Sequence, residues 1–293
     1  MPILSLFNRA ARVSSWTTPK KVAGLDPSFF DTQGNGFEVD ALRLQFKIDK
    51  NLTGEPNTAE VTITNAAPDT RTALCKKPSQ VRIEAGYQDT GARLLFTGDL
   101  RFGTSVHNGT DWDTKLQLAD GGRAISTARA RRSFAKPISA FEVMTYVATT
   151  LNLKLPPEVE QDPELRAAFA NGVSVNGASR DVLTRLLAPY GYGWSVQNGR
   201  LQIIQDGQIV QGQSWVISKE TGMIGYPRIT APAKGTSTCD IDVDVALFPE
   251  LTPGQSVKIE SEILTGVYKL IQVVHEGDSR GDDWKTSCKC RPL

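Results

Sequence analysis

The sequence lacks an excess of charge of either sign. Its 293 residues include 33 Lys and Arg against 32 Asp and Glu, which gives a formal net charge of +1. A protein that grips nucleic acid by neutralising phosphates needs a clear basic excess. We therefore expect that any DNA this protein meets passes without specific binding.

Long apolar runs are also missing. Residues 1–7 are mostly apolar, but Asn8 and Arg9 interrupt them, and no later stretch approaches the length of a membrane span. We expect a chain that is made soluble, with no membrane insertion of its own. Residues 1–36 are interpreted as an N-terminal arm, either a loose tail or a segment that docks on a neighbour. One side of a short helix is predicted there by Ile3, Leu6, Phe7, Ala10 and Val13.

Cysteine and histidine are scarce. The four cysteines (Cys75, Cys239, Cys288 and Cys290) include no CxxC pair, which indicates folding in a reducing cytoplasm rather than a disulfide framework. Strand alternation puts Cys288 and Cys290 on one face; metal ligation is one interpretation, and we favour two small core residues. Neither a Gly-rich phosphate loop nor a Gly-x-Ser-x-Gly elbow is present. We expect no catalytic residues, no cofactor and no metal.

The sequence does contain a long internal repeat. Residues 96–118 resemble residues 264–290. In each copy, Thr-Gly is followed by a histidine and then by Asp-Trp, and these two histidines are the only ones in the sequence. The repeated positions are His107 and Trp112 in the first copy and His275 and Trp284 in the second. The second copy has four more residues between His and Trp, where a hairpin loop tolerates a change of length.

The repeat extends further upstream in both copies. Residues 78–84 match 253–260, which include Val257 and Ile259, and residues 59–64 match 239–244. Because the two histidines then occupy equivalent places in two modules rather than one pocket, a structural or interface role is favoured over catalysis. An acid-plus-aromatic ligand site at the Asp-Trp pairs is an alternative to simple cross-strand packing, which we favour. The candidate interface or structural residues are His107, Trp112, Val257, Ile259, His275 and Trp284.

The predicted fold is mainly β with an α+β part: two homologous antiparallel β-barrel or sandwich modules, at 37–130 and 211–293, separated by a small α+β domain at 131–210. Alternating polar and apolar residues predict strands in both modules. In the middle part the period changes to 3.6, with a capping box from Ser139 to Glu142 and an Asn198-Gly199 hairpin turn. The basic stretch 123–132, with Lys136 beyond it, lies where the first module meets the middle domain and is interpreted as a solvated linker, with contact to a polyanion as the alternative.

Five stretches carry a family resemblance: SKETGMIGYP at 218–227, LTPGQSV at 251–257, GVYK at 266–269, VHEGDSRGDDW at 274–284 and EPNTAE at 55–60. They resemble the baseplate hub proteins of contractile-tailed bacteriophages, and the resemblance spans residues 38–293. It implies two tail-tube-like β-barrels in each chain and a homotrimer of six barrels. Such a trimer would match the sixfold tail tube to the threefold central spike, contact other baseplate proteins, and surround the DNA channel.

The resemblance also implies a place in the virion, in the tail baseplate, after assembly in the cytoplasm of the host bacterium. Two other functions compete with this structural role. One is a tail-associated carbohydrate- or host-binding module, which would be favoured by binding to cell-surface glycans. The other is a cell-wall hydrolase, which would require lysis of peptidoglycan that depends on His107 or His275.

Overall fold

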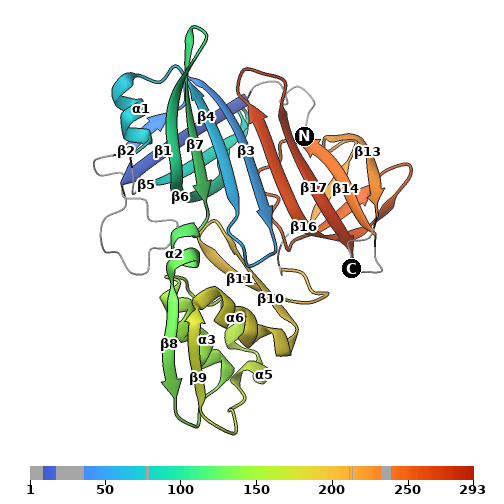
Figure 1. Ribbon diagram of the computed structural model, residues 1–293. Coiled ribbons are helices and arrows are strands. Elements are labelled where there is room, and N and C mark those ends of the chain that lie inside the picture. The colour runs from blue at the N-terminus through green and yellow to red at the C-terminus, as the bar shows by residue number, and fades with distance from the viewer. Residues whose placement is uncertain (1–8, 18–35, 77–78, 211, 213, 232–238) are drawn as a thin grey trace.

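The computed structural model describes residues 9–17, 36–76, 79–210, 212, 214–231 and 239–293. The chain is mainly β with antiparallel sheets, as the sequence predicts. One large sheet includes strands of both repeat copies, and a smaller α+β part lies below it in the view of Figure 1. Nothing in the described ranges forms a helix long and apolar enough to cross a membrane.

The first half of the large sheet holds the strands of the first repeat copy. Its strands are β1 (Arg9–Thr17), β2 (Gly36–Val39), β3 (Arg43–Asn51), β4 (Thr58–Thr64), β5 (Ser79–Tyr87), β6 (Gly91–Asn108) and β7 (Asp111–Ala119), with helix α1 (Pro68–Leu74) between β4 and β5. The strand order is β3-β4-β7-β6-β5-β1-β2, and every pair is antiparallel.

The second half holds the strands of the second copy. Its strands are β12 (Trp215–Ser218), β13 (Met223–Thr230), β14 (Asp240–Ala246), β15 (Ser256–Glu260), β16 (Thr265–Asp278) and β17 (Trp284–Pro292). The order β13-β14-β17-β16-β15 repeats the order β3-β4-β7-β6-β5 of the first half, and only β12 pairs in parallel, with β15. The second half therefore has the same succession of neighbours as the first.

Closed barrels, however, are absent from the part of the chain that the structure describes. The strands form one open path from β13 to β2, because β16 continues the sheet into β3 instead of closing on its own half. The expectation of two closed barrels is corrected to this extent. The backbone N–H and C=O groups of a strand edge can pair with a strand of the neighbouring half, so that closure into a barrel is not needed to satisfy them.

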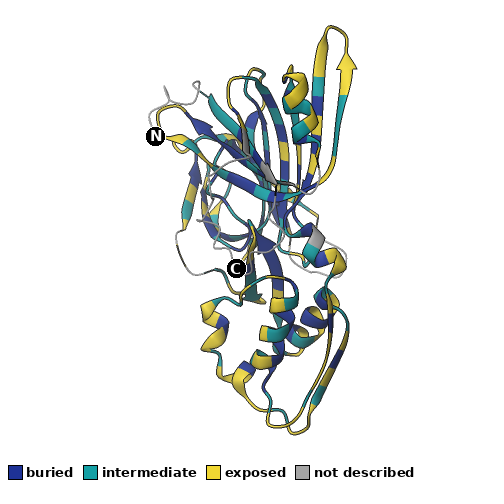
Figure 2. Cartoon of the chain, turned by 90° about the vertical axis from the view of Figure 1, so that its left-hand side faces the viewer, coloured by how far each residue is buried: buried dark blue, intermediate teal, exposed yellow. Residues whose placement is uncertain are grey.

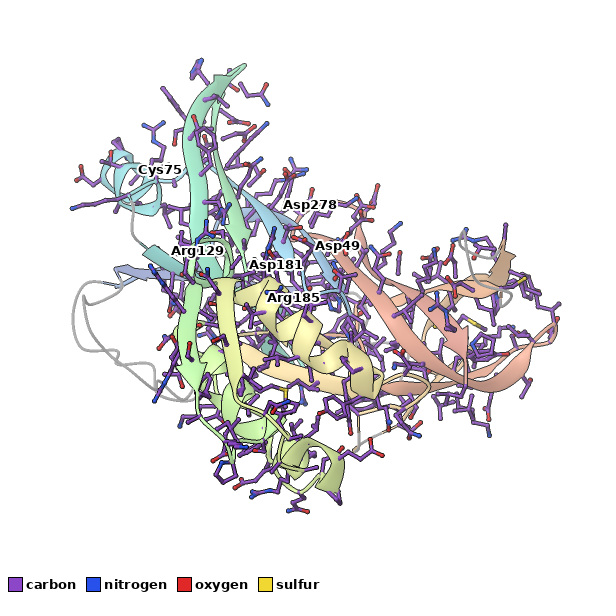
Figure 3. All side chains as sticks on the ribbon, turned by 60° about the horizontal axis from the view of Figure 1, so that its bottom comes forward. Asp49, Cys75, Arg129, Asp181, Arg185 and Asp278 are labelled. Carbon is purple, nitrogen blue, oxygen red and sulfur yellow. The ribbon has the colours of Figure 1, made fainter. Side chains whose placement is uncertain are left out.

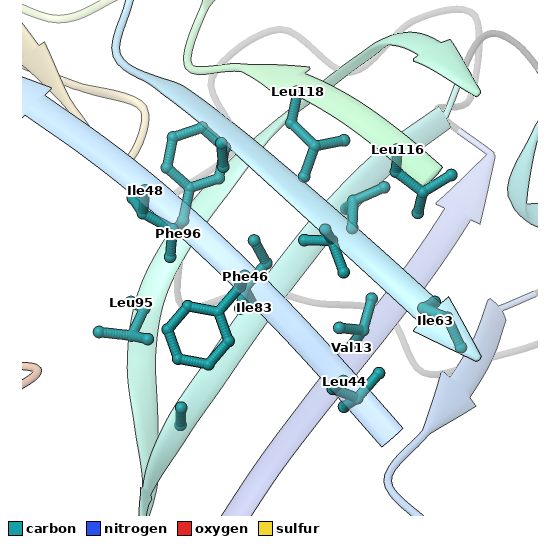
Figure 4. Close-up of a cluster of buried hydrophobic side chains, with 14 of the residues drawn as sticks. Val13, Leu44, Phe46, Ile48, Ile63, Ile83, Leu95, Phe96, Leu116 and Leu118 are labelled. Atoms are coloured by element: carbon teal, nitrogen blue, oxygen red, sulfur yellow. The ribbon is translucent and has the colours of Figure 1, made fainter. Parts of the chain in front are cut away.

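Strict alternation builds the core of the first half. Leu44, Phe46 and Ile48 of β3 are buried on one face, and the polar residues between them point to the other face. Figure 4 shows these side chains packed with those of β5, β6 and β7. Burying one such side chain stabilises the fold by about 1.5–3 kcal/mol, so that the pattern holds the strand in the sheet.

The N-terminal segment is part of this core. Residues 1–8 lie outside the described residues, but residues 9–17 form β1, which pairs with β5 along its whole length and buries Val13. The predicted helical side at Ala10 and Val13 is therefore wrong. In the strand, Val13 shares the core face with Ala11, two residues away, and Ala10 lies on the other face.

The α+β part has its own core between two small sheets and several helices. The sheets pair β8 (Arg129–Phe134) with β9 (Val173–Ala178) and β10 (Tyr192–Gln197) with β11 (Arg200–Gln205). The helical elements are α2 (Gly122–Thr127), α3 (Ala140–Thr150), α4 (Pro157–Glu160), α5 (Pro163–Arg166), α6 (Ser179–Leu187) and the 3-10 helix η2 (Ala188–Tyr190).

Local sequence signals are confirmed in this part. Ser139 and Glu142 form the capping box at the start of α3, and Asn198 and Gly199 both have positive φ in the two-residue turn between β10 and β11. The basic stretch is not wholly a linker, because residues 129–134 form β8. The Arg132 guanidinium lies 5.0 Å from the centre of the Phe134 ring and 5.3 Å from that of Tyr146.

Candidate functional site

The candidate site is the seam between the two halves of the large sheet. We define the seam as residues 45–51 of β3 and residues 272–278 of β16, which pair antiparallel. Ile48 lies opposite His275, and Phe46 lies opposite Gly277. The seam joins the two repeat copies through continuous backbone pairing, so that it fixes how one half is placed against the other.

A buried carboxylate anchors one end of the seam. Asp278 of β16 accepts hydrogen bonds from the Arg43 guanidinium (2.6 Å), from Gln45 (2.9 Å) and from the backbone N–H of Arg280 (2.9 Å). Burial alone would raise the pKa of Asp278, but these hydrogen bonds outweigh it and lower that pKa to about 2. The carboxylate therefore stays ionised and ties β16 to β3.

Further polar pairs cross the seam on its solvent side. The Lys47 ammonium lies 2.7 Å from the Glu276 carboxylate, and Gln272 donates to Asp49 at 2.9 Å. Asp49 and Asp278 are labelled in Figure 3 on the two neighbouring strands, β3 and β16. Exposed ion pairs of this kind contribute about 0–1 kcal/mol, so that they fix the register more than they stabilise the seam.

An aromatic pair covers the other side of the same end. The rings of Phe46 and Trp284 meet edge to face with centroids 5.5 Å apart, and Arg9 lies 5.3 Å above the Trp284 ring. Gly277 allows this packing, since a Cβ there would lie 2.3 Å from the Phe46 ring. The glycine is required at this position by the close approach of Phe46.

A buried polar cluster lies at the opposite end, where the seam meets the α+β part. Asn57 donates to the Val196 carbonyl (2.7 Å) and to the Gln197 side chain (2.9 Å), and Gln197 donates in turn to the Asn51 carbonyl (2.8 Å). Asp120 accepts from the backbone N–H of Gly199 at 2.8 Å. The β10–β11 hairpin is therefore tied to the ends of β3, β4 and β7.

Three ionisable side chains are buried here: Asp120 of this cluster, and Lys50 and His275 of the seam strands. Burial lowers the pKa of Lys50 to about 8 and raises the pKa of Asp120 to about 7. Burial also lowers the pKa of His275, whose Nδ1 lies 2.9 Å from the Thr286 hydroxyl. Perturbed pKa values of this kind occur at active sites and also in structural ion clusters.

The surroundings of these groups favour a structural role. Lys50, Asp120 and His275 are each 1% exposed or less, which leaves no room for a substrate beside them. A cavity of about 650 Å³ lies on the solvent side of the sheet, lined by charged and polar side chains that include Lys47, Glu60 and Arg101. The described part of the chain holds no group of three or more His, Cys, Asp or Glu placed to bind a metal ion.

The structure places the predicted residues in three locations. His275 and Trp284 lie at the seam. Val257 and Ile259 are fully buried in the core of the second half, together with Cys288 and Cys290, which share one strand face as predicted. Replacing Val257 or Ile259 with a charged residue would therefore test whether that half folds. The third location is the tip of the β6–β7 hairpin.

The hairpin tip carries the other two predicted residues in an exposed position. The rings of His107 and Trp112 lie 5.0 Å apart, and the Arg71 guanidinium stacks 4.0 Å above the Trp112 ring. Figure 2 shows this hairpin projecting from the sheet with an exposed tip. His107 and Trp112 are therefore not brought together with His275 and Trp284 within one chain.

The pairing also corrects the equivalence of the two histidines. His107 lies opposite Trp112, whereas His275 lies opposite Thr286. Ser105 is the residue that corresponds to His275: its hydroxyl lies 3.0 Å from Thr114, as the His275 ring lies 2.9 Å from Thr286. The sequence match is shifted by two residues along this strand, although it is in register at Trp112 and Trp284.

Sequence reasoning missed Arg43 and Asp278, which hold one end of the seam, and the buried charged residues Lys50 and Asp120. One signal was available for Lys50. It continues the buried series Leu44, Phe46 and Ile48 at period two, and a charge on a core face indicates a buried partner. Asp278 had no such signal, because it stands in a glycine-rich loop composition that suggests solvent.

Comparison with known proteins gives one family. The family model described as "Baseplate hub gp41" matches residues 31–290. No curated protein matches the chain at a significant level.

Solved structures share the fold at low sequence identity. The tail protein from Neisseria meningitidis MC58 is 10% identical with a TM-score of 0.62, and 97% of each chain is covered. The 43 kDa tail protein of prophage MuSo2 from Shewanella oneidensis is 8% identical with a TM-score of 0.62, over 87% of this chain and 94% of that one. The E. coli c3393 protein, a component of the type VI secretion system, is 12% identical with a TM-score of 0.57, over 86% and 73%. These likenesses show the fold alone.

Proposed function

This chain belongs to the baseplate hub gp41 family, and from that premise we propose that it is a homotrimeric structural hub of a phage tail baseplate. In this proposal three chains supply six sheet halves around one axis. The six halves face the sixfold tail tube on one side, and the threefold trimer faces the central spike on the other. Other baseplate proteins contact its outer surface.

One observation carries the proposal: the two halves have the same strand order and are joined edge to edge by the seam. Side-by-side joining of two similar units is the repeating step of a ring. A chain with two such units in a trimer presents six similar surfaces while keeping threefold symmetry. The division into an arm at 1–36, modules at 37–130 and 211–293 and a middle domain at 131–210 belongs to the proposal, with β1 assigned to the first module.

We further propose that the solvent face of β3, β4 and β7 lines the channel through which DNA passes. This face carries charges of both signs, such as Lys47, Asp49 and Glu60 around the 650 Å³ cavity. Mixed charges on a chain of net charge +1 do not bind a polyanion tightly. The role is structural rather than catalytic, which the burial of Lys50, Asp120 and His275 supports.

The native mass of the purified protein tests this function. Light scattering should give about three times 31.9 kDa, and averaged electron micrographs of the same sample should show a hollow ring with six similar densities. The interfaces of such a trimer should be of obligate size, on the order of 2,000 Å² or more. A compact monomer at all concentrations, also after co-expression with tube and spike proteins, would contradict the trimer.

A further inference from the structure

Two of the strand edges that lack a partner among the described residues lie on β13 and β6. β13 pairs only with β14, and residues 102–108 of β6 pair only with β7. Both edges carry exposed apolar side chains: Ile224, Tyr226 and Ile229 on β13, and Phe102 and Val106 on β6. An unpaired edge with apolar side chains is a template for another strand, and soluble proteins normally cover it.

The free part of β6 corresponds to the part of β16 that forms the seam. Each strand has a bulge at the same place, after Leu100 in β6 and after Leu270 in β16. Counting from the bulges, Ser105 corresponds to His275 and Val106 to Glu276. The matching hydrogen bonds to Thr114 and Thr286 support this count.

The free edge β13 corresponds in the same way to β3, the other strand of the seam. Ile48 of β3 lies opposite Ala59 in β4, and Ile229 of β13 lies opposite Ile241 in β14. The two isoleucines therefore occupy corresponding positions. Ile48 is 0% exposed and packs in the core of the first half, whereas Ile229 is 69% exposed.

We infer that β13 of one chain pairs antiparallel with residues 103–108 of β6 in a neighbouring copy of this chain, in the register of the seam. Transfer of that register places Thr104 opposite Thr230, Ser105 opposite Ile229, and Val106 opposite Arg228. The inference rests on the proposed trimer and names the strands that close it.

β13 is an end strand in the second half of the sheet, whereas the free part of β6 lies in the first half, beyond the residues that pair with β5, and Figure 1 shows the two far apart. One chain cannot pair them with each other, so the contact is head to tail. A head-to-tail contact gives a ring when its rotation closes and an open filament when it does not. Three seams within chains would alternate with three such contacts between chains.

Aromatic residues at the two edges support the same contact. Trp284 packs on Phe46 at the seam, and the corresponding residue to Trp284 is Trp112 at the β6–β7 tip. The position of Phe46 corresponds to the bulge of β13 between Ile224 and Arg228, which contains the exposed Tyr226. In the proposed contact Tyr226 of one chain approaches Trp112 of the next.

Cysteine pairs test the register directly. In a Cys75→Ser, Cys239→Ser background we would make two in-register double variants, Thr104→Cys with Thr230→Cys and Ser105→Cys with Ile229→Cys. Adjacent antiparallel pairs alternate between wide and narrow spacing, so that one of the two brings its Cβ atoms within disulfide reach. The control is Thr104→Cys with Ile229→Cys, where a one-residue slip puts the side chains on opposite faces.

We expect a covalent trimer on mild oxidation for at least one in-register pair, reversed by reduction, and at most a tenth as much for the control. A trimer by light scattering in which neither in-register pair cross-links would overturn the contact and leave the hub trimer standing. A chain that is monomeric at every concentration would overturn both. Equal cross-linking of the control would show random collision and would also overturn the contact.

A second variant separates assembly from folding. Ile229→Asp should shift the native mass from trimer to monomer, because it places an unpaired charge in the contact. Ile263→Asp is the matched control, since Ile263 is equally exposed but lies in the turn between β15 and β16, on neither edge. A trimer that persists in Ile229→Asp with unchanged dissociation would contradict the proposal.

Discussion

The seam within the chain and the free edges of β13 and β6 are built from corresponding strands, yet they differ in side chains and in burial. Ion pairs such as Lys47 with Glu276 cross the seam, whereas the position on β6 that corresponds to Glu276 is occupied by Val106. Ile48 is 0% exposed and Ile229 is 69% exposed at matching places. The comparison teaches that corresponding positions can differ in burial when one strand lies inside the large sheet and the other forms its end.

Substitution of the two tryptophans should give the largest difference in stability between the seam and the free edges. Trp284→Ala should lower the free energy of unfolding by about 3–5 kcal/mol, because Trp284 is 6% exposed and packs on Phe46. Trp112→Ala at the matching position should cost the monomer about 1 kcal/mol or less, the size of an exposed cation–π contact. Urea unfolding of both variants measures the difference. Equal losses would mean that Trp112 is covered within the chain.

Substitution of Ile48 and Ile229 tests the same difference between the seam and the free edges. Ile48→Ala should cost about 2–5 kcal/mol, since it leaves a cavity in a close-packed core. Ile229→Ala should change the stability of the unassembled chain by about 0.5 kcal/mol or less, as for other surface substitutions. The measurement is again chemical denaturation, at a concentration where both variants have the same native mass. A loss above about 2 kcal/mol for Ile229→Ala would place it in a core.

Asp278 gives a smaller and pH-dependent effect. Asp278→Asn should cost about 1–2 kcal/mol at neutral pH, because it weakens the charge-assisted hydrogen bond from the partly exposed Arg43. The pKa of Asp278 is lowered to about 2 in the folded chain, against about 3.9 for an unfolded Asp. The contribution is therefore complete above about pH 4 and is lost as the pH falls toward 2.

Denaturation of wild type and Asp278→Asn between pH 2 and pH 7 checks this prediction. The stability difference should shrink toward zero at the acid end. Arg43→Gln should remove part of the same effect, and the double variant should cost less than the sum of the two single ones. A difference that does not change with pH would show that Asp278 is not the ionised anchor of the seam.

Several local features followed from the sequence alone. Alternation at Leu44, Phe46 and Ile48 predicted both the strand β3 and its buried face. The capping box at Ser139 and the Asn198-Gly199 turn were also predicted correctly. Each depends on interactions within a few residues, where backbone geometry and side-chain type leave one favourable arrangement.

The alignment of the two repeat copies along β6 and β16 could not be predicted from the sequence in the same way. Matching His107 with His275 is wrong by two residues, yet a shift of two leaves every side chain on the same face of a strand. The hydrophobic pattern is therefore satisfied in either register. Bulges at corresponding places in β6 and β16, and the pairing of Ser105 and His275 with matching threonines, decided it.

The amino-acid sequence by itself determined a mainly β chain with two similar halves, the strand faces and the turns, because these depend on periodicity and local geometry. Only the tertiary structure decided that the halves share one open sheet, that Arg43 and Asp278 hold the seam, and that β13 and the end of β6 each have one edge without a partner among the described residues. Strand edges are alike in sequence whether or not they have a neighbour. Pairing between segments more than 200 residues apart therefore has to be seen in three dimensions.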